Sequence, residues 1–365
     1  MQSHLTHILN AFLLTVVAIL MLERAAFRVG LVDRPSARKN HGRHVPLVGG
    51  LAMFASFLVA SLLADESLRA PWNFLLGTGA LVLLGALDDV LDIPAVIKLI
   101  VQIIAAAIIV IPGWYIVGSL GNLLGEGNLE LGVLALPFTL LFMVGLINSF
   151  NMLDGLDGVA GGAAACAFFW LAVIASTGSR DGTVNSLLLL LSATLGFLTF
   201  NMRHPWSRQA RVFMGDAGSM LLGAAVAFFA ISTARQLPGE AGFPALLWLF
   251  AVPVLDTLSL IVRRLWAGRS PFSADRQHLH HLFLEYGATP GQASAIVVIL
   301  CALHGAVGTA GVLLGVSDQV MAWGLLLPAA LHTLFVFRRS TARIAAPLLR
   351  VPSLDTSAPS NGRQT

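Results

Sequence analysis

Charged residues are scarce in this chain of 365 residues, because Asp, Glu, Lys and Arg make up only 11% of it. Soluble domains carry about 25% charged residues, so the scarcity excludes an ordinary water-soluble globule. Hydrophobic residues make up 56% and the mean hydropathy is +0.81, which excludes a disordered chain as well. Only two cysteines are present, Cys166 and Cys301, and they imply no disulfide or metal framework.

Long hydrophobic runs make up most of the sequence. A hydrocarbon core about 30 Å thick takes roughly 20 apolar residues per helical crossing. We therefore predict an all-α polytopic membrane protein, a single bundle of about 11 transmembrane helices within residues 1–350, followed by a disordered cytoplasmic tail over 351–365. The predicted spans are 5–26, 46–64, 72–87, 95–112, 133–150, 159–177, 184–201, 215–234, 243–262, 292–314 and 319–337.

Lys and Arg collect in alternate connections between these spans. One side of the predicted bundle holds 17 of the 22 basic residues, and the loops of the other side hold only Arg69, Arg180 and Arg235. The positive-inside rule then predicts that the N-terminus is outside and the C-terminus is cytoplasmic. The long outer connection 113–132 is expected to form a small hairpin.

Six carboxylates lie at the predicted cytoplasmic rim of the bundle. A carboxylate near the hydrocarbon boundary is costly unless it is paired, bound to a metal or facing a wet cavity. We therefore expect these residues to form a site that binds a cation. They are Asp88, Asp89, Asp92, Asp154, Asp157 and Asp216.

The first acidic block is the DDxxD motif over 88–92. On a helix its three carboxylates share roughly one face. Adjacent carboxylates repel each other unless a cation intervenes, and hard oxygen ligands beside phosphate favour Mg²⁺, with Mn²⁺ as an alternative. The other interpretation is a solvated acidic turn ahead of Pro94.

Two further blocks combine polar residues with glycine. Within 148–158, four polar residues recur every three positions, and helix capping explains only one or two of them. These four are Asn148, Asn151, Asp154 and Asp157. The motif FMGDAGS over 213–219 opens the eighth span, and its Asp216 is either a helix cap or a metal ligand.

Three histidines, His278, His280 and His281, stand in the longest predicted cytoplasmic connection, just after Arg276. Their spacing does not support a structural zinc site. Imidazoles beside an arginine suit an anionic, phosphate-bearing substrate, and a solvated loop is the other interpretation. Asp256, inside the ninth span, is either a site-facing acid or one side of an interhelical pair.

In order and spacing these blocks resemble one family, the polyprenyl-phosphate N-acetylhexosamine-1-phosphate transferases (the glycosyltransferase 4 or MraY–WecA superfamily). The resemblance also includes DRP at 33–35, RKxH at 38–41 and VPxxGG at 45–50. The segment DRQHLHH at 275–281 is similar to the histidine loop of the WecA-like branch. The compact DDVLDIP connection at 88–94 lacks the basic insert typical of MraY-type chains.

The resemblance implies an enzyme that transfers an N-acetylhexosamine 1-phosphate from a UDP-sugar to undecaprenyl phosphate and releases UMP. N-acetylglucosamine is the expected sugar, and Mg²⁺ is the expected cofactor. The implied role is the first membrane step of a cell-envelope glycan such as the O-antigen of lipopolysaccharide. The implied setting is the bacterial inner membrane, with the active site on its cytoplasmic face. No nucleic acid partner is expected, and the resemblance is compatible with a homodimer.

The resemblance also divides the roles of the residues. Asp216 would be the principal Mg²⁺ ligand, and Asn151 would be a further ligand. Asp88 and Asp89 would also take part in metal binding and would orient or deprotonate the lipid phosphate. The predicted catalytic residues are Asp88, Asp89, Asp154, Asp157 and Asp216. The predicted substrate-binding residues are Lys39, Lys98, Asn148, Asn151, Arg276, His278, His280 and His281.

Three alternative functions stay open at this point. An MraY-type phospho-N-acetylmuramoyl-pentapeptide transferase shares the same blocks. A UbiA-type intramembrane prenyltransferase also uses DDxxD acids, but it would need a second acid-rich block of the DxxxD type. A secondary transporter would place its ionisable residues near the bilayer midplane on broken helices, whereas here they lie at one rim.

Overall fold

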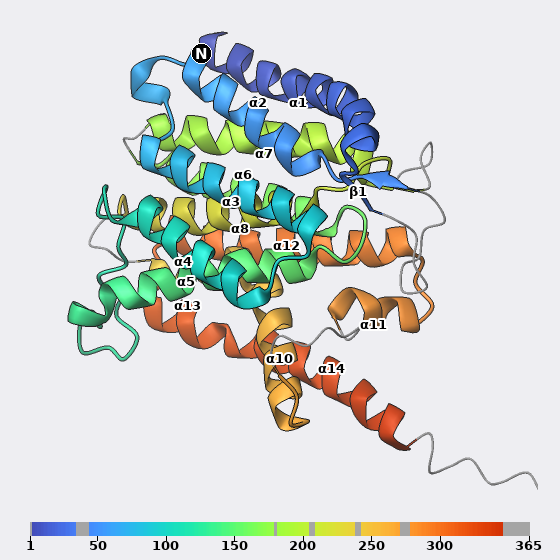
Figure 1. The fold of residues 1–365 in the computed structure, drawn as a ribbon. Coiled ribbons are helices and arrows are strands. Elements are labelled where there is room, and N and C mark those ends of the chain that lie inside the picture. The colour runs from blue at the N-terminus through green and yellow to red at the C-terminus, as the bar shows by residue number, and fades with distance from the viewer. Residues whose placement is uncertain are drawn as a thin grey trace, which may run out of the picture.

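The computed structural model describes residues 2–33, 44–178, 181–203, 209–237, 242–270 and 278–345. Within them the chain is almost entirely helical, and most of the helices run side by side in one bundle (Figure 1). The predicted all-α class is therefore confirmed. The predicted site residues Lys39 and Arg276 and the predicted tail 351–365 lie outside the described residues.

The helices follow the predicted spans closely. The first eight are α1 (Gln2–Val29), α2 (Gly49–Leu63), α3 (Trp72–Leu91), α4 (Ala95–Val110), α5 (Ala135–Leu153), α6 (Val159–Ala175), α7 (Asp181–Asn201) and α8 (Gly215–Ala234). The chain continues through α9 (Phe243–Leu247), η4 (Trp248–Phe250), α10 (Ala251–Trp266), α11 (Leu279–Glu285), α12 (Pro290–Leu313), α13 (Asp318–Gly324) and α14 (Leu326–Ala345). The connections contain β1 (Val32–Asp33), β2 (Val45–Pro46), η1 (Glu66–Leu68) and η2 (Gly132–Leu134).

The length and composition of the helices identify a multi-pass membrane protein. Among the described residues, eight helical segments are long and apolar enough to cross a membrane. The three shorter apolar helices α2, α4 and α6 coincide with the remaining predicted spans. Large apolar side chains such as Met21 and Leu141 are 71% exposed on the outer helices, as expected for surfaces that face lipid.

Helix α8 is the buried centre of the bundle, and small residues let its neighbours approach its backbone. A Cβ atom on Gly50 of α2 would lie 2.1 Å from the backbone nitrogen of Gly218. A Cβ atom on Gly85 of α3 would lie 2.2 Å from the backbone nitrogen of Ala217. This close packing sets the C-terminal end of α3 beside the N-terminal end of α8.

The predicted ninth span, 243–262, is not one straight helix. It is divided into α9, η4 and α10, and α10 runs across the direction of the bundle (Figure 1). The break falls at Phe250, whose φ of −128° and ψ of 20° leave the helical region. Pro253 lacks the N–H that would bond to the carbonyl of Leu249, so an unbroken helix is disfavoured here.

Two connections contain short paired segments. Strands β1 and β2 pair antiparallel, with Val32 opposite Pro46. The carbonyl of Pro46 accepts a hydrogen bond from the N–H of Phe213 at 2.9 Å, which joins this pair to the motif that opens α8. In the predicted outer hairpin, Ser119 and Glu130 form an isolated antiparallel bridge.

Candidate active site

The predicted carboxylates gather at one end of the bundle. Asp88 and Asp89 lie in the last turn of α3, Asp216 lies in the first turn of α8, and Asp154 directly follows α5. Asp89 Oδ1 accepts a hydrogen bond from the backbone N–H of Asp216 at 3.1 Å, although the two are 127 residues apart in sequence. The glycine-mediated packing of α3 on α8 explains this approach.

Lys98 is the cation within this cluster. Its Nζ lies 2.7 Å from Asp88 Oδ2 and 3.7 Å from Asp216 Oδ2. Pro94 precedes α4, and Lys98 stands in the first turn of that helix, facing back toward the end of α3. The two carboxylates supply the partners that an ammonium in an apolar helix requires.

Asp89 is held against the N-terminus of α8, where the helix dipole favours negative charge. A Cβ atom on Gly215, whose φ is +67°, would lie 2.2 Å from Asp89 Oδ2, so glycine is required there for both conformation and space. Asp89 Oδ2 is itself buried and has no hydrogen-bond partner among the described residues. A buried carboxylate oxygen without a partner is costly, and a bound cation would satisfy it.

The two asparagines of the second block have different partners. Asn151 Nδ2 donates hydrogen bonds to Asp216 Oδ1 at 3.0 Å and to Ser219 Oγ at 2.9 Å. Asn148, about one turn earlier on α5, donates instead to Gln102 Oε1 of α4 at 2.8 Å. The structure therefore brings Asn151 into the carboxylate cluster and places Asn148 in the α4–α5 contact.

The two aspartates of the same block also differ. Burial and the nearby charges of Asp216, Asp89 and Asp157 raise the pKa of Asp154 to about 8. Asp157 Oδ2 lies 2.7 Å from Arg203 Nε, just after the end of α7. Asp154 therefore interacts with the carboxylate cluster, whereas Asp157 is engaged in an ion pair beside it.

The prediction that all three acids of the DDxxD motif share one helical face is wrong for Asp92. Helix α3 ends at Leu91, and Asp92 follows as its C-cap in the left-handed conformation, with φ of 53°. Pro94 favours this ending, because a proline disfavours helical conformation in the residue before it and lacks a backbone N–H. Asp92 is exposed to solvent.

The three predicted histidines come together beside the second block. The ring centroids of His278 and His280 are 5.5 Å apart, and those of His280 and His281 are 4.3 Å apart. His280 Nε2 lies 2.5 Å from where a Cβ on Gly155 would be. Helix α11 is therefore placed next to the loop that carries Asp154.

Asp256 fixes the orientation of the first histidine. Its Oδ2 lies 2.9 Å from His278 Nδ1, and its Oδ1 accepts the backbone N–H of Leu279 at 2.8 Å. A carboxylate only accepts, so the Nδ1–H of His278 donates this hydrogen bond and the ring is held with Nε2 on its other side. His332 Nε2 of α14 lies 3.7 Å from Asp256 Oδ1. The sequence patterns missed this residue, although a histidine within an apolar span could have marked it as a partner for a buried acid.

His280 is expected to contribute a loss of stability at mildly acidic pH, opposite in sign to the contribution of Asp154, whose raised pKa stabilises the folded chain as the pH falls. Burial, together with the charges of His281 and His278, lowers the pKa of His280 to about 3, against 6.5 in the unfolded chain. Between these values only the unfolded chain binds the proton, so this residue alone lowers the unfolding free energy by about 2 kcal/mol from pH 7 to pH 5. Thermal unfolding in detergent at both values, for the natural chain and for His280→Gln, isolates this part, because the contribution of Asp154 is common to both proteins. The variant should lose less stability, or gain more, from pH 7 to pH 5; an equal pH dependence in the two proteins would contradict the assignment.

The oxygen donors at the carboxylate-bearing end of the bundle fit Mg²⁺. Among the described residues, no three His, Cys, Asp or Glu side chains are arranged to hold a metal ion by themselves. Mg²⁺ usually keeps several waters and binds one or two carboxylates together with substrate phosphates, so a complete protein cage is not required. The partnerless Oδ2 of Asp89, beside Asp216, is the observation that supports such a site.

Comparison with known proteins agrees with this arrangement. Residues 71–234 match the sequence profile described as glycosyl transferase family 4. The chain is 33% identical over 322 residues to the undecaprenyl-phosphate alpha-N-acetylglucosaminyl 1-phosphate transferase of Escherichia coli strain K12, covering 88% of this chain and 87% of that protein. It is 31% identical over 327 residues to the protein of the same name from Haemophilus influenzae, covering 90% and 91%. This chain therefore belongs to glycosyl transferase family 4.

Proposed function

We propose that this protein transfers N-acetylglucosamine 1-phosphate from its UDP-sugar to undecaprenyl phosphate and releases UMP. The supporting observation is the cluster of Asp88, Asp89 and Asp216 around Lys98 at one end of the bundle, in a chain whose bacterial relatives are named for this activity. In the cell the reaction would begin a membrane-linked envelope glycan such as O-antigen.

The chemical difficulty lies in bringing two phosphates together. Unit charges 4 Å apart repel by about 4 kcal/mol at an effective dielectric constant of 20. Mg²⁺ held by Asp216, with Asp88, Asp89 and Asn151, would neutralise the diphosphate and stabilise the phosphoryl group during transfer. An oxygen of the lipid phosphate forms the new bond to the sugar-linked phosphorus, and UMP departs as the old P–O–P bond breaks.

The chain's own groups position the two substrates. Asp88 is fixed at both oxygens, because Oδ1 accepts the N–H of Ile93 at 2.7 Å and Oδ2 pairs with Lys98. A carboxylate held this firmly can orient the acceptor phosphate or take its proton. On the other side, the second ring nitrogen of His278, Nε2, would pair with a hydroxyl or amide N–H of the donor sugar.

Asp256 is a positioning residue in this account. Asp256→Asn keeps the shape but offers His278 an amide that can donate, which allows the other tautomer. We expect kcat to fall about 10- to 100-fold, as for other groups that orient a functional histidine. Steady-state kinetics for the UDP-sugar measure this, with Asp65→Asn, an exposed acid at the other end of the bundle, as control. Unchanged kinetics in Asp256→Asn would contradict the role.

The proposed topology has eleven crossings, with the N-terminus outside and the carboxylate cluster on the cytoplasmic side of the bacterial inner membrane. The distribution of Lys and Arg supports it. A fluorescent protein that matures only in the cytoplasm, fused after the last residue, should fluoresce. A dark fusion that is present in the membrane at full length would contradict the orientation.

A donor panel tests the proposed reaction. Purified protein in detergent receives undecaprenyl phosphate, Mg²⁺ and, in turn, UDP-N-acetylglucosamine, UDP-N-acetylgalactosamine and UDP-N-acetylmuramoyl-pentapeptide. The proposal predicts that the first donor releases UMP fastest and that EDTA stops the release. Preference for the pentapeptide donor would assign the MraY-type reaction instead.

A further inference from the structure

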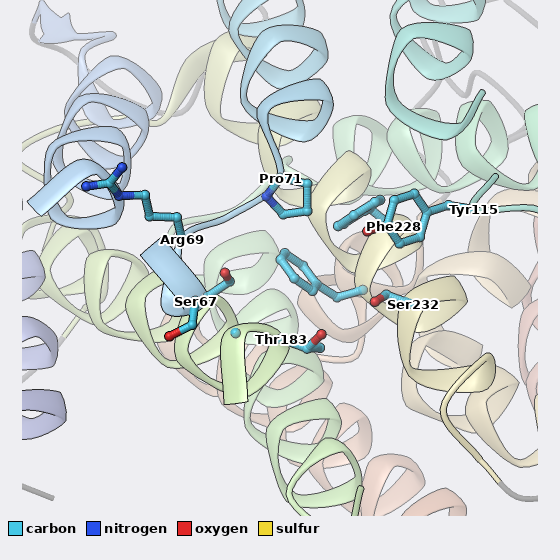
Figure 2. A pocket seen from close by; sticks show the side chains of 10 residues that line it. Ser67, Arg69, Pro71, Tyr115, Thr183, Phe228 and Ser232 are labelled. Carbon is cyan, nitrogen blue, oxygen red and sulfur yellow. The ribbon is translucent and has the colours of Figure 1, made fainter. Parts of the chain in front are cut away.

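A cavity of about 360 Å³ lies at the end of the bundle away from the carboxylates (Figure 2). Ser232, near the end of α8, lines it. Ser232 and Asp216 are 16 residues apart on this helix, which corresponds to about 24 Å along its axis. The cavity is therefore separate from the candidate active site.

Two long helices begin at this cavity. Pro71, which precedes the first residue of α3, and Gly182 and Thr183, in the first turn of α7, all line it. Figure 2 shows Pro71 at the end of α3 on one side and Thr183 at the end of α7 on the other. The first N–H groups of a helix have no partner within it, and Pro71 makes no side-chain cap bond. Both positive helix ends therefore face the cavity.

Ser186, about one turn into α7, supplies an independent observation. It lines the cavity, it is only 1% exposed, and its Oγ has no hydrogen-bond partner in the part of the chain that the structure describes. A buried hydroxyl without a partner is costly, so a bound group that pairs with it would be favoured. The side chains of Ser67, Thr183 and Ser232 place further hydroxyls around the same space (Figure 2).

Of the ten residues that line the cavity, Arg69 is the charged one. None of the ten carries a carboxylate. Arg69 lines the rim, where its Nε donates to the carbonyl of Ala64 at 3.1 Å, and the Cζ of Arg235 lies 5.3 Å from the ring centre of Tyr115, another lining residue. Arg69 points its guanidinium away from the cavity (Figure 2), so it adds positive potential without contact.

We propose that this cavity binds a phosphate group. Two helix N-termini and several hydroxyl donors, with no lining carboxylate, are the chemistry that recognises such an anion. The rings of Tyr115, Phe228 and Phe229 line the same space and suit an apolar part of the molecule that carries the phosphate. Inorganic phosphate and an anionic lipid headgroup both present this group, and the experiment separates them.

The test uses the full chain, delipidated in detergent with EDTA, and measures the thermal unfolding midpoint. Inorganic phosphate and phosphatidylglycerol are titrated separately against the natural chain, Ser186→Ala and Ser176→Ala. Ser176 Oγ already bonds to the carbonyl of Val173 at 2.7 Å, just after α6, so it is the matched control. We expect Ser186→Ala to need about tenfold more ligand for the same shift, and Ser176→Ala to match the natural chain.

Each outcome decides the proposal. A response to both ligands that Ser186→Ala weakens assigns the cavity to the phosphate group itself, and a weakened response to phosphatidylglycerol alone assigns it to a lipid headgroup. Phosphate that binds at the active site affects all three proteins alike and cancels in the comparison. Equal responses in the three proteins, or no response in any, would overturn the proposal.

Discussion

Asp216→Asn is expected to slow UMP release about 100- to 1,000-fold while the protein still folds. The amide has the size of the carboxylate but lacks its charge, so the group that faces Lys98 and would hold Mg²⁺ is lost. Folding should persist because the Asn151 amide can still donate to the remaining oxygen and Asp89 still caps α8. Initial rates, together with the thermal unfolding midpoint in detergent, measure both parts of this expectation.

Asp92→Asn is the matched control, since it makes the same chemical change at the same end of the bundle. Asp92 is exposed, and asparagine tolerates its left-handed conformation well. Its rate should stay within about twofold of the natural chain, because surface substitutions of this kind change energies little. Full activity in Asp216→Asn, or equal losses in both variants, would contradict the assignment of the site.

Gly85→Ala is expected to destabilise the protein by about 3 kcal/mol and to lower activity as well. The new Cβ would lie 2.2 Å from the backbone nitrogen of Ala217, and backbone atoms of a central helix cannot rotate away. Helix α3 would have to move from α8, which separates Asp89 from the N–H of Asp216. Thermal unfolding and UMP release should therefore fall together.

Gly145→Ala on α5 controls for the change in helix propensity. A Cβ at Gly145 meets no atom within 4 Å, so this variant should be as stable as the natural chain or slightly more stable. If Gly85→Ala unfolded at the same temperature as Gly145→Ala, the account of the α3–α8 contact would be wrong.

The sequence predicted those parts of the fold and site that depend on local pattern. Hydropathy located the helices because each crossing needs its own apolar run, and every predicted span overlaps a helix. The grouping of Asp88, Asp89, Asn151 and Asp216 also followed from motifs at the ends of neighbouring spans. Lys98 was predicted to contact phosphate, a role that stays a proposal, and the structure pairs it with two of these acids.

What the sequence could not show depends on contacts between distant segments. Asn148 fits the polar repeat, but Gln102 on a neighbouring helix takes its amide. The choice between two roles for Asp256 required the position of His278. The break at Phe250 and the cavity at the other end of the bundle depend likewise on how helices meet.

The most direct test of the central claim follows radiolabel from UDP-N-acetylglucosamine into lipid by purified protein. Parallel reactions contain or lack undecaprenyl phosphate, and contain Mg²⁺ or EDTA. We expect labelled lipid and an equal amount of UMP only when undecaprenyl phosphate and Mg²⁺ are both present. UMP release without the lipid, or no lipid product from folded protein under any of these conditions, would contradict the claim.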